Sequence, residues 1–549
     1  MMKAWVKSGQ PWVWLSSAAV SASLIIVLGL LALIAVRGLA HFWPARVMQA
    51  TYQAANAQPV RIVGEIVESE DVPVERLNEI ALKDKTKIVT RYLIKTGNRD
   101  ALGSDFRWLI GPWISDTTYP QDIVAIERRE WGNFYGYPKI LKENGKVVQQ
   151  GNGLWSALEN RVARANDLFH QIRKIEKNDI GAINYALESL RLKTRSLELK
   201  HDTDPAKRKA VADRRAELEA EYANLQQRLK TLYTDINRDS LVAEIMDGQT
   251  LELPVAKMVR VYQPNKLGVF GRIGIYFEQL WEFVSDEPRE ANTEGGIFPA
   301  IFGTVMMVII MSVLVTPFGV VAAVYLKEYA KQGFLTRAIR VAVNNLAGVP
   351  SIVYGVFGLG FFVYFLGGNI DRLFFPEALP APTFGTPGIL WSSLTLAILT
   401  VPVVIVATEE GLSRIPRAIR EGSLALGATK AETLWRTVLP MATPAMMTGV
   451  ILAVSRAAGE VAPLMLVGVV KLAPTLPLDS SFPFLHLDRK FMHLGFHIYD
   501  VGFQSPNVEA ARPLVYATAL LLVVVIVLLN LTAIMVRNRL RERFRALDS

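Results

Sequence analysis

"SRIPRAIREGSLALGATKAETLWRTVLP" (413–440) lies between two apolar runs and carries the signals of two short helices that meet at a bend. Pro416 suits the first turn of a helix, and Gly427 suits its left-handed end. Thr429 and Glu432 stand three residues apart, the spacing of a capping box, in which each side chain accepts a hydrogen bond from the other residue's backbone N–H. We therefore expect one helix before Gly427 and a second that opens at Thr429.

The second helix is predicted to be amphipathic and to end before Pro440. Ala431, Leu434, Trp435 and Val438 occupy positions i, i+3, i+4 and i+7, which places them on one apolar face. An exposed face of this kind needs a partner. The periodicity leaves two partners open: the inner membrane surface, on which an amphipathic pair would lie, or another protein.

The composition indicates a membrane protein with at least one polar domain. The chain has 549 residues, 51% of them hydrophobic, and a mean hydropathy of +0.25. It contains no cysteine, which excludes a disulfide framework and a thiolate metal site. The net charge of +9 does not indicate nucleic acid, because arginines flank apolar runs, as in "RNRLRERFR" (537–545) after the last run. We expect a membrane-lipid environment and no nucleic-acid partner.

Six apolar runs have the length of roughly 20 residues that is needed to cross a bilayer core. They are Trp14–Val36, Ile297–Leu326, Leu346–Leu366, Ile389–Ala407, Met446–Val470 and Leu514–Val536. The first run is too long for the apolar region of a signal peptide and has no convincing cleavage site, so we expect it to be retained.

Lysines and arginines flank alternate loops, beginning with Lys3 and Lys7, which predicts that both termini face the cytoplasm. The predicted parts are a cytoplasmic N-terminus (1–13), a first transmembrane helix (14–36), an outer insertion (37–296), a membrane domain (297–536) with the cytoplasmic loop 413–440, and a basic cytoplasmic tail (537–549).

The outer insertion is expected to be a β-rich domain that carries a helical hairpin. Apolar residues recur at alternating spacings of three and four over about 154–240, with a turn near "KHDTDPAK" (200–207), which predicts two long antiparallel helices. "KIVTRYLI" (87–94) has the alternation of a strand, and Asn144-Gly145 and Asp247-Gly248 are hairpin signals. The βαβ alternation of a small-molecule binding lobe is missing, which favours a spacer or a docking platform.

Two charges interrupt the fifth apolar run. Arg456 and Glu460 are one helical turn apart in "VSRAAGEVAPLM" (454–465), where an ionised side chain costs about 2.5–3.5 kcal/mol. They could neutralise each other as a packing pair. A solute path is favoured because arginine ahead of glutamate is the poorer order within a helix, the residues between them are small, and Pro463 frees backbone carbonyls.

A guanidinium offers forked donors that match the edge of a phosphate. Arg456 is therefore the candidate group that balances the charge of a passing anion. Glu460 is the candidate group that keeps Arg456 from binding the anion too tightly.

The order of residues in 413–440 resembles the EAA loop of ABC importer permease subunits, whose pattern is Glu-Ala-Ala, three residues, Gly, nine residues, Ile-x-Leu-Pro. Glu421, Gly427 and Leu439-Pro440 match, whereas Gly422 and Ser423 replace the two alanines and Thr437 replaces the isoleucine. In that family the loop forms coupling helices that dock into a groove on a separate ATPase. The resemblance implies these coupling residues: Glu421, Gly427, Ala428, Leu434, Trp435, Leu439 and Pro440.

From Gly295 onward the chain resembles the A-type permease subunit of phosphate-specific ABC importers. The matching segments, in order, are "GGIFPAIFGT" (295–304), "YLKEYA" (325–330), "AGVPSIVYGVFGLG" (347–360), the EAA-type loop and "RAAGEVAPLMLVG" (456–468). The resemblance implies an all-α polytopic membrane protein with six transmembrane helices and the type I importer permease fold. The long outer insertion departs from the short form of the family and adds an α+β extracytoplasmic part with a helical hairpin.

The resemblance implies a phosphate permease that is a transport subunit and not an enzyme. The chain has no G-x-x-x-x-G-K-[ST] phosphate loop, so ATP and Mg are expected on a partner and no cofactor is expected on this chain. The implied partners are a C-type phosphate permease subunit, an ABC ATPase dimer and a periplasmic phosphate-binding protein. The implied location is the bacterial inner membrane, crossed several times.

Two other functions stay open at this stage. The same machine could carry another oxyanion, since one sequence does not fix the ion. A membrane sensor would also place a helical hairpin between two spans, but only short loops and a basic tail follow the second span. His486, His493 and His497 permit a metal site in the outer loop, although "FMHLGFHIYD" (491–500) reads equally as a short amphipathic helix against the outer surface.

Overall fold

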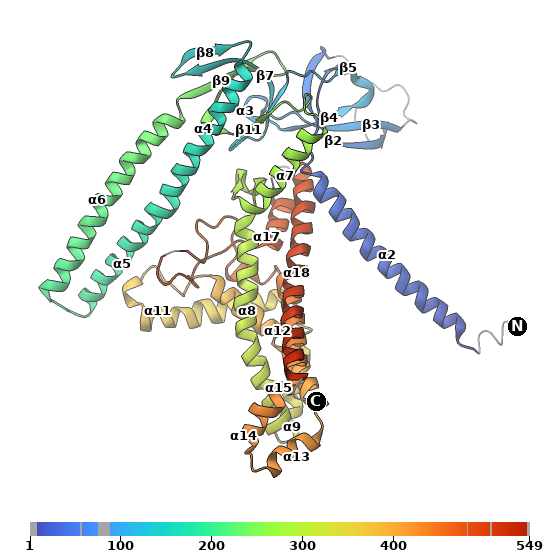
Figure 1. Ribbon diagram of the computed structural model, residues 1–549, viewed down its shortest axis with the longest axis vertical. Helices are drawn as coiled ribbons and strands as arrows, with labels where there is room; N and C mark the ends of the chain where they lie inside the picture. The colour runs from blue at the N-terminus through green and yellow to red at the C-terminus, as the bar shows by residue number, and fades with distance from the viewer. Residues whose placement is uncertain (1–7, 55–56, 75–87, 480, 506–507, 546–549) are drawn as a thin grey trace. The chain divides into compact units, whose positions relative to one another are not determined.

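The computed structural model describes residues 8–54, 57–74, 88–479, 481–505 and 508–545. The predicted cytoplasmic flank with Lys3 and Lys7, and the last four residues of the basic tail, lie outside the described residues. The chain divides into two compact units, which are Phe42–Gly296 and the combination of Met1–His41 with Ile297–Ser549 (Figure 1). We call them the outer unit and the membrane unit.

The membrane unit contains six helices that are long and apolar enough to span a bilayer, counted among the described residues, which confirms the six predicted spans. They are α2 (Gln10–Ala40), α8 (Phe298–Val324) with the π turn Tyr325–Tyr329, α10 (Ser351–Phe357) continued by a π segment (Gly358–Gly367) and α11 (Gly368–Phe374), α12 (Ile389–Arg414), α14 (Lys430–Thr433) continued into α15 (Leu439–Gly459), and α18 (Val508–Arg545).

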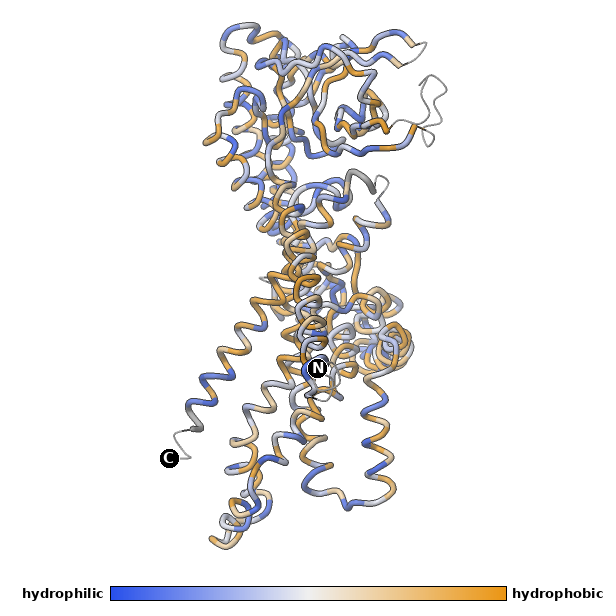
Figure 2. Tube along the Cα trace, turned by 90° about the vertical axis from the view of Figure 1, so that its right-hand side faces the viewer, coloured by the Kyte–Doolittle hydropathy of each residue, from blue (hydrophilic) through white to orange (hydrophobic). Residues whose placement is uncertain are grey.

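Helix α12 is the central helix of this unit. A Cβ on Gly319 of α8 would lie 2.6 Å from Val404 of α12, and a Cβ on Gly449 of α15 would lie 2.7 Å from Ala407 of the same helix. Both glycines therefore let a neighbouring helix approach α12 closely, as small residues do in membrane bundles. Figure 2 shows hydrophobic residues, drawn in orange, along much of the helical part of the chain.

The fifth span differs from its predicted bounds of Met446–Val470. Its helix begins earlier, because α14 and α15 form one continuous helix through the π turn Leu434–Val438, and it ends at Gly459. The physical reason for the early end is Pro463, whose ring would clash with the carbonyl of Gly459, four residues back, in a continuing helix. Beyond this break the chain forms only the short helix α16 (Leu464–Val467).

The described residues of the outer unit form two large antiparallel sheets. One has the order β4-β3-β2-β1-β5, and the other has the order β10-β9-β7-β6-β11 with β8 paired to β7. The strands are β1 (Val47–Tyr52), β2 (Val60–Pro73), β3 (Ile88–Lys95), β4 (Phe106–Ile110), β5 (Ile114–Thr118), β6 (Val124–Arg128), β7 (Phe134–Glu143), β8 (Lys146–Gln150), β9 (Asp239–Glu244), β10 (Thr250–Pro254) and β11 (Met258–Tyr262). The two sheets share an apolar core. Ile62 and Ile94 come from the first sheet, Tyr135 and Tyr262 come from the second, and Met246 follows β9.

Both predicted β-hairpin turns are confirmed. Asn144 and Gly145 have φ values of 48° and 76° between β7 and β8, the left-handed pair that a two-residue hairpin loop requires. Gly248, with φ of 83°, lies in the turn between β9 and β10.

The predicted helical hairpin is also confirmed. Its first arm is α4 (Leu154–Lys174) joined through the π turn Ile175–Asp179 to α5 (Ile180–Leu199), and its second arm is α6 (Pro205–Ile236). Asp204 caps α6 by accepting a 2.9 Å hydrogen bond from the N–H of Ala206. The hairpin is anchored to the second sheet by an apolar cluster that includes Leu158, Val162, Leu232, Ile236 and Leu241.

A further long helix of the outer unit was not predicted from the sequence. Helix α7 (Val269–Ser285) follows β11, and two short paired strands, β12 (Pro288–Arg289) and β13 (Glu294–Gly295), come after it.

Candidate functional site

The first helix of the loop 413–440 is α13 (Arg417–Ala425), and Pro416 stands just before it. It ends as predicted at Gly427, whose φ is +88°. The N–H of Gly427 donates to Leu424 O at 3.0 Å, and the N–H of Ala428 donates to Ser423 O at 3.3 Å, so the carbonyls of the last turn are satisfied. No atom lies within 4 Å of the place where a Cβ on Gly427 would stand. Its backbone conformation alone therefore favours glycine.

The predicted capping box is present at the start of the second helix. The N–H of Thr429 donates to Glu432 Oε2 at 2.9 Å, and the N–H of Glu432 donates to Thr429 Oγ1 at 3.3 Å. The hydroxyls of Ser423 and Thr433 are 2.9 Å apart, which links the two helices across the bend. Caps and this link fix the angle between the helices.

The prediction that the second helix ends before Pro440 is wrong. Helix α14 passes through a π turn, Leu434–Val438, directly into α15, with Pro440 in the first turn of α15. The wider π turn lies where the ring of Pro440 would otherwise meet the carbonyl of Arg436. The second short helix is thus the beginning of the fifth span.

The π turn also divides the predicted apolar face. Leu434 and Val438 are buried in a cluster with Leu412 and Ile415, whereas Trp435 is 73% exposed. An extra residue in the turn breaks the 3.6-residue periodicity on which the single face was predicted. Leu434 is therefore part of the packing of the segment and does not lie on its outer surface.

The exposed apolar surface of the segment consists of Leu424, Leu426 and Trp435, and we call it the loop surface. Leu426 is 91% exposed at the tip of the bend. Sequence reasoning missed both leucines, although two leucines in the last turn before Gly427 are an unusual ending for a polar helix. Of the other predicted coupling residues, Glu421 is exposed, and Ala428, Leu439 and Pro440 are half-buried.

Charged side chains brace the segment against the end of α8. Arg420 pairs with Glu328, with 3.0 Å between Nη2 and Oε1, and donates to Leu412 O at 2.7 Å. Lys430 donates to the carbonyl of Glu328 and lies 4.6 Å from the ring centre of Tyr329. These contacts join both helices of the bend to one helix end of the membrane unit.

Arg456 and Glu460 lie together, but they do not share a helix face as predicted. Arg456 is in the last turn of α15, and Glu460 is just beyond the helix end in extended backbone, with φ of −81° and ψ of 133°. Arg456 Nε and Glu460 Oε1 are 3.5 Å apart. Only Arg456 is helical, so the two residues are not an ordered i,i+4 pair within a helix.

The break after Gly459 gives the pair a different setting from a mid-helix position. The negative end of the α15 dipole favours the cation of Arg456. Both side chains keep some exposure, 35% for Arg456 and 21% for Glu460, and no atom lies within 4 Å of a Cβ built on Gly459. A Cβ on Gly355 of α10 would stand 2.7 Å from the Cα of Pro463, so the third span packs closely on the chain just past the break. A loosely paired guanidinium next to open space can exchange its carboxylate for an anion.

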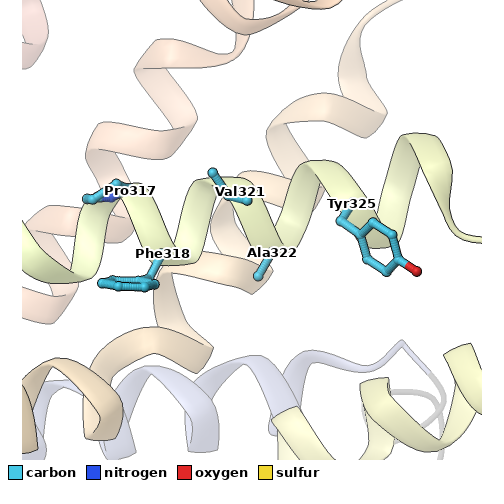
Figure 3. A pocket seen from close by; sticks show the side chains of 5 residues that line it. All are labelled: Pro317, Phe318, Val321, Ala322 and Tyr325. Atoms are coloured by element: carbon cyan, nitrogen blue, oxygen red, sulfur yellow. The ribbon is translucent and has the colours of Figure 1, made fainter.

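A separate apolar hollow of about 550 Å³ lies along α8. Figure 3 shows its lining by Pro317, Phe318, Val321, Ala322 and Tyr325. Among these residues only Tyr325 has a polar side-chain group, so the hollow offers no cation to an anionic solute.

The outer-loop histidines do not form a metal cluster within the described part of the chain. The predicted helix at 491–500 is shorter, α17 (Leu494–Tyr499), and Leu494 and His497 are buried, so it does not lie amphipathically on a surface as expected. His493 caps it: Nδ1 accepts a 3.1 Å hydrogen bond from the N–H of Gly495. Burial lowers the pKa of His493 to about 4, so its imidazole is neutral.

Comparison of the sequence with known proteins assigns the chain to a family. The model of the binding-protein-dependent transport system inner membrane component matches residues 315–545, which include the loop 413–440 and Arg456. The chain is 34% identical over 250 residues to phosphate transport system permease protein PstA 1 of Mycobacterium tuberculosis (strain CDC 1551 / Oshkosh), covering 44% of this chain and 71% of that protein. The chain belongs to the PstA family of phosphate transport permeases.

Other relatives agree with this assignment. The probable PstA of Methanocaldococcus jannaschii is 30% identical over 221 residues, covering 40% of this chain and 67% of that protein. Among solved structures, the MetNI methionine ABC transporter in an inward facing conformation is 17% identical, with a TM-score of 0.32 over 44% of this chain and 94% of that chain. The membrane unit has the type I ABC importer permease fold that the sequence resemblance implied. The chain is a transport component of the membrane and crosses it several times.

Proposed function

We propose that this protein is the permease subunit of an ATP-driven importer that moves inorganic phosphate across the bacterial inner membrane. The observation that carries the proposal is the family match across residues 315–545, which joins the loop 413–440 and the Arg456–Glu460 pair in one membrane unit. The alternative of a membrane sensor has no support from the relatives.

The loop surface of Leu424, Leu426 and Trp435 is the contact for a separate ATPase subunit, present as a dimer, which holds the ATP and Mg. Its two helices are capped, linked and braced to α8, so a push on the bend is transmitted into α8 and α15. This surface faces the cytoplasm, as do both termini, which agrees with the lysines and arginines that flank alternate loops. Glu421, beside the surface, contributes a charge to the same contact.

The remaining partners follow from the architecture of such importers. A C-type permease supplies the second half of the passage, and a periplasmic binding protein delivers the anion. A relative of this chain is itself named a C-type subunit, phosphate transport system permease protein PstC of Xylella fastidiosa (strain 9a5c), at 30% identity over 217 residues.

Arg456 balances the charge of the anion during its passage, and Glu460 takes the guanidinium back afterwards. The 3.5 Å separation and the partial exposure of both groups support this exchange. A phosphate oxygen pair matches the fork of the guanidinium in the same way as a carboxylate does.

The test is ATP-driven uptake of radiolabelled phosphate in a strain without other phosphate carriers. Arg456→Gln should abolish most uptake at a normal protein level. Arg414→Gln is the matched control. Arg414 also pairs with a glutamate four residues away, Glu410, but both side chains of that pair are exposed. Uptake by the Arg456→Gln variant equal to that of the control would exclude the proposed role of Arg456.

A double replacement separates the path from a packing pair. With Arg456→Met and Glu460→Gln together, no buried charge is left unpaired, so a packing role predicts normal uptake. The proposed path predicts a protein that accumulates normally and does not transport. Competition of uptake by unlabelled phosphate, sulfate, molybdate and arsenate then identifies the ion.

A further inference from the structure

Helix α7 (Val269–Ser285) of the outer unit has an apolar face that points away from the unit. Phe270, Ile273, Phe277 and Trp281 recur at spacings of three and four and point out of the unit. Phe270 is 90% exposed and Trp281 is 72% exposed. The apolar face of this helix is therefore the one that the outer unit does not cover.

The opposite face of α7 packs on the outer unit through apolar side chains, among them Phe283 and Ile275, and through polar groups. Arg260 of β11 pairs with Glu282 at 2.9 Å and with Glu127 at 2.8 Å, and Gln279 donates to Glu127 at 2.6 Å. An outer face that carries Phe270, Phe277 and Trp281 is unsuited to water. It is suited to an apolar medium.

The start of the outer unit ties α7 to the first span. Phe42 packs on Phe283, with 5.0 Å between ring centres, and Trp43 packs on Tyr276 at 6.0 Å. Helix α2 ends at Ala40, and three residues of chain reach at most about 11 Å. Tyr276, at the middle of α7, is therefore held close to the end of a membrane span by chain connectivity alone.

The end of the outer unit ties α7 to the second span. The pairing of β12 with β13 returns the chain to the end of α7. There the N–H of Gly296 donates at 3.1 Å to the carbonyl of Glu287, which lies two residues after the helix ends. Helix α8 begins at Phe298, at most about 7 Å of chain further on. Both tethers lead into apolar spans, so only a short length of chain separates α7 from two of them.

We propose that α7 lies in the membrane–water interface on the side of the outer unit, with Phe270, Phe277 and Trp281 inserted among the lipids. Aromatic side chains are enriched at this depth, and an amphipathic helix with a strong apolar face lies in the plane of the interface. Trp43 and Tyr276, next to the end of α2, belong to the same aromatic belt. In this position α7 seats the outer unit on the bilayer.

The absence of cysteine from the chain permits a direct test. Single cysteines at 269–282 of the full-length protein are spin-labelled and reconstituted into phosphatidylethanolamine–phosphatidylglycerol vesicles. Collision rates of each label with oxygen, which concentrates in lipid, and with Ni(II)EDDA, which stays in water, are then measured. Val148→Cys is the control, because Val148 is an exposed apolar residue on β8.

The ratio of oxygen to nickel collisions should oscillate along α7 with a period of 3.6 residues. Its maxima should fall at 270, 277 and 281, well above the ratio at Val148, and should persist in the assembled transporter. Water-like ratios at these three positions would overturn the proposal. Exclusion of both reagents would overturn it as well, because that result means that protein covers the face.

Discussion

Arg420 of α13 and Glu328, in the π turn that follows α8, form an ion pair with 3.0 Å between Nη2 and Oε1. Both side chains are largely buried, and the guanidinium also holds the carbonyl of Leu412 at 2.7 Å. The pair makes the bend and the end of α8 one mechanical piece. Displacement of the loop surface by an ATPase would therefore move α8 together with α15.

Removal of this brace should uncouple ATP hydrolysis from transport. Arg420→Ala leaves the carboxylate of Glu328 without its partner, which costs about 1–3 kcal/mol of local stability. We expect reconstituted transporter with Arg420→Ala to hydrolyse ATP but to move less phosphate per ATP. Arg414→Ala, which breaks an exposed ion pair with Glu410, should change this ratio little.

The loop surface should account for most of the affinity for the ATPase subunit. Trp435→Ala or Leu426→Ala removes an exposed apolar anchor, and such anchors contribute about 2 kcal/mol or more at interface hot spots, or roughly thirtyfold in affinity. Binding is measured with purified ATPase and the permease in detergent. Leu434→Ala is the contrasting variant: Leu434 is buried, so its loss should lower thermal stability more than affinity, and the reverse result would contradict the assignment of the surface.

Gly427 and Gly422 form a matched pair in the same segment. Both have open space where a Cβ would stand, but only Gly427 has a positive φ, of +88°. Gly427→Ala should cost about 1–2 kcal/mol through backbone strain and should weaken co-purification of the ATPase. Gly422→Ala lies within α13 and should stabilise that helix by about 1 kcal/mol, since alanine is the better helix former. Equal behaviour of the two variants would show that the bend does not need its left-handed residue.

Buried His493 should make stability depend on pH. Its pKa falls from 6.5 to about 4 on folding, so the unfolded state binds more protons between these values. Stability from the neutral imidazole is complete above pH 6.5 and decreases as the pH falls to 4, by up to about 3 kcal/mol. His493→Asn keeps an acceptor for the N–H of Gly495 but cannot titrate. The drop in melting temperature between pH 7.5 and 5 should therefore be smaller for this variant than for the unmodified protein, and an equal drop would contradict the buried state of His493.

Local signals predicted the features that local physics determines. Gly427, the capping box of Thr429 and Glu432, and the Asn144-Gly145 turn are each specified by hydrogen bonds or φ values within a few residues. The spans were visible because a bilayer demands about 20 apolar residues. Each of these predictions needed only the sequence of one short segment.

Other features depend on partners that are distant in the sequence. The π turn Leu434–Val438 changes which residues of one helix are buried, and a 3.6-residue pattern does not contain that information. The pairing of Arg420 with Glu328 links different helices. The end of the fifth span at Gly459 was missed because apolar composition continues past it, although Pro463 marked the break.

Helix α7 was not predicted, for a related reason. Its aromatic residues have the spacing of a core-facing helix, and the polar partners that turn this face outward, Arg260 and Glu127, come from two separate strands.

We propose the bend at 413–440 as the contact through which an ATPase drives this membrane unit. Leu426→Cys introduces a single thiol into the chain at a position of the bend where the native side chain is 91% exposed. A photoactivatable thiol-linked probe on this residue, in membranes that contain the whole transporter, should crosslink to the ATPase subunit, with a yield that changes when ATP is trapped. The same probe on Val148→Cys should give no such product. Absence of the ATPase from the crosslinked products of Leu426→Cys, at normal protein level, would contradict the account.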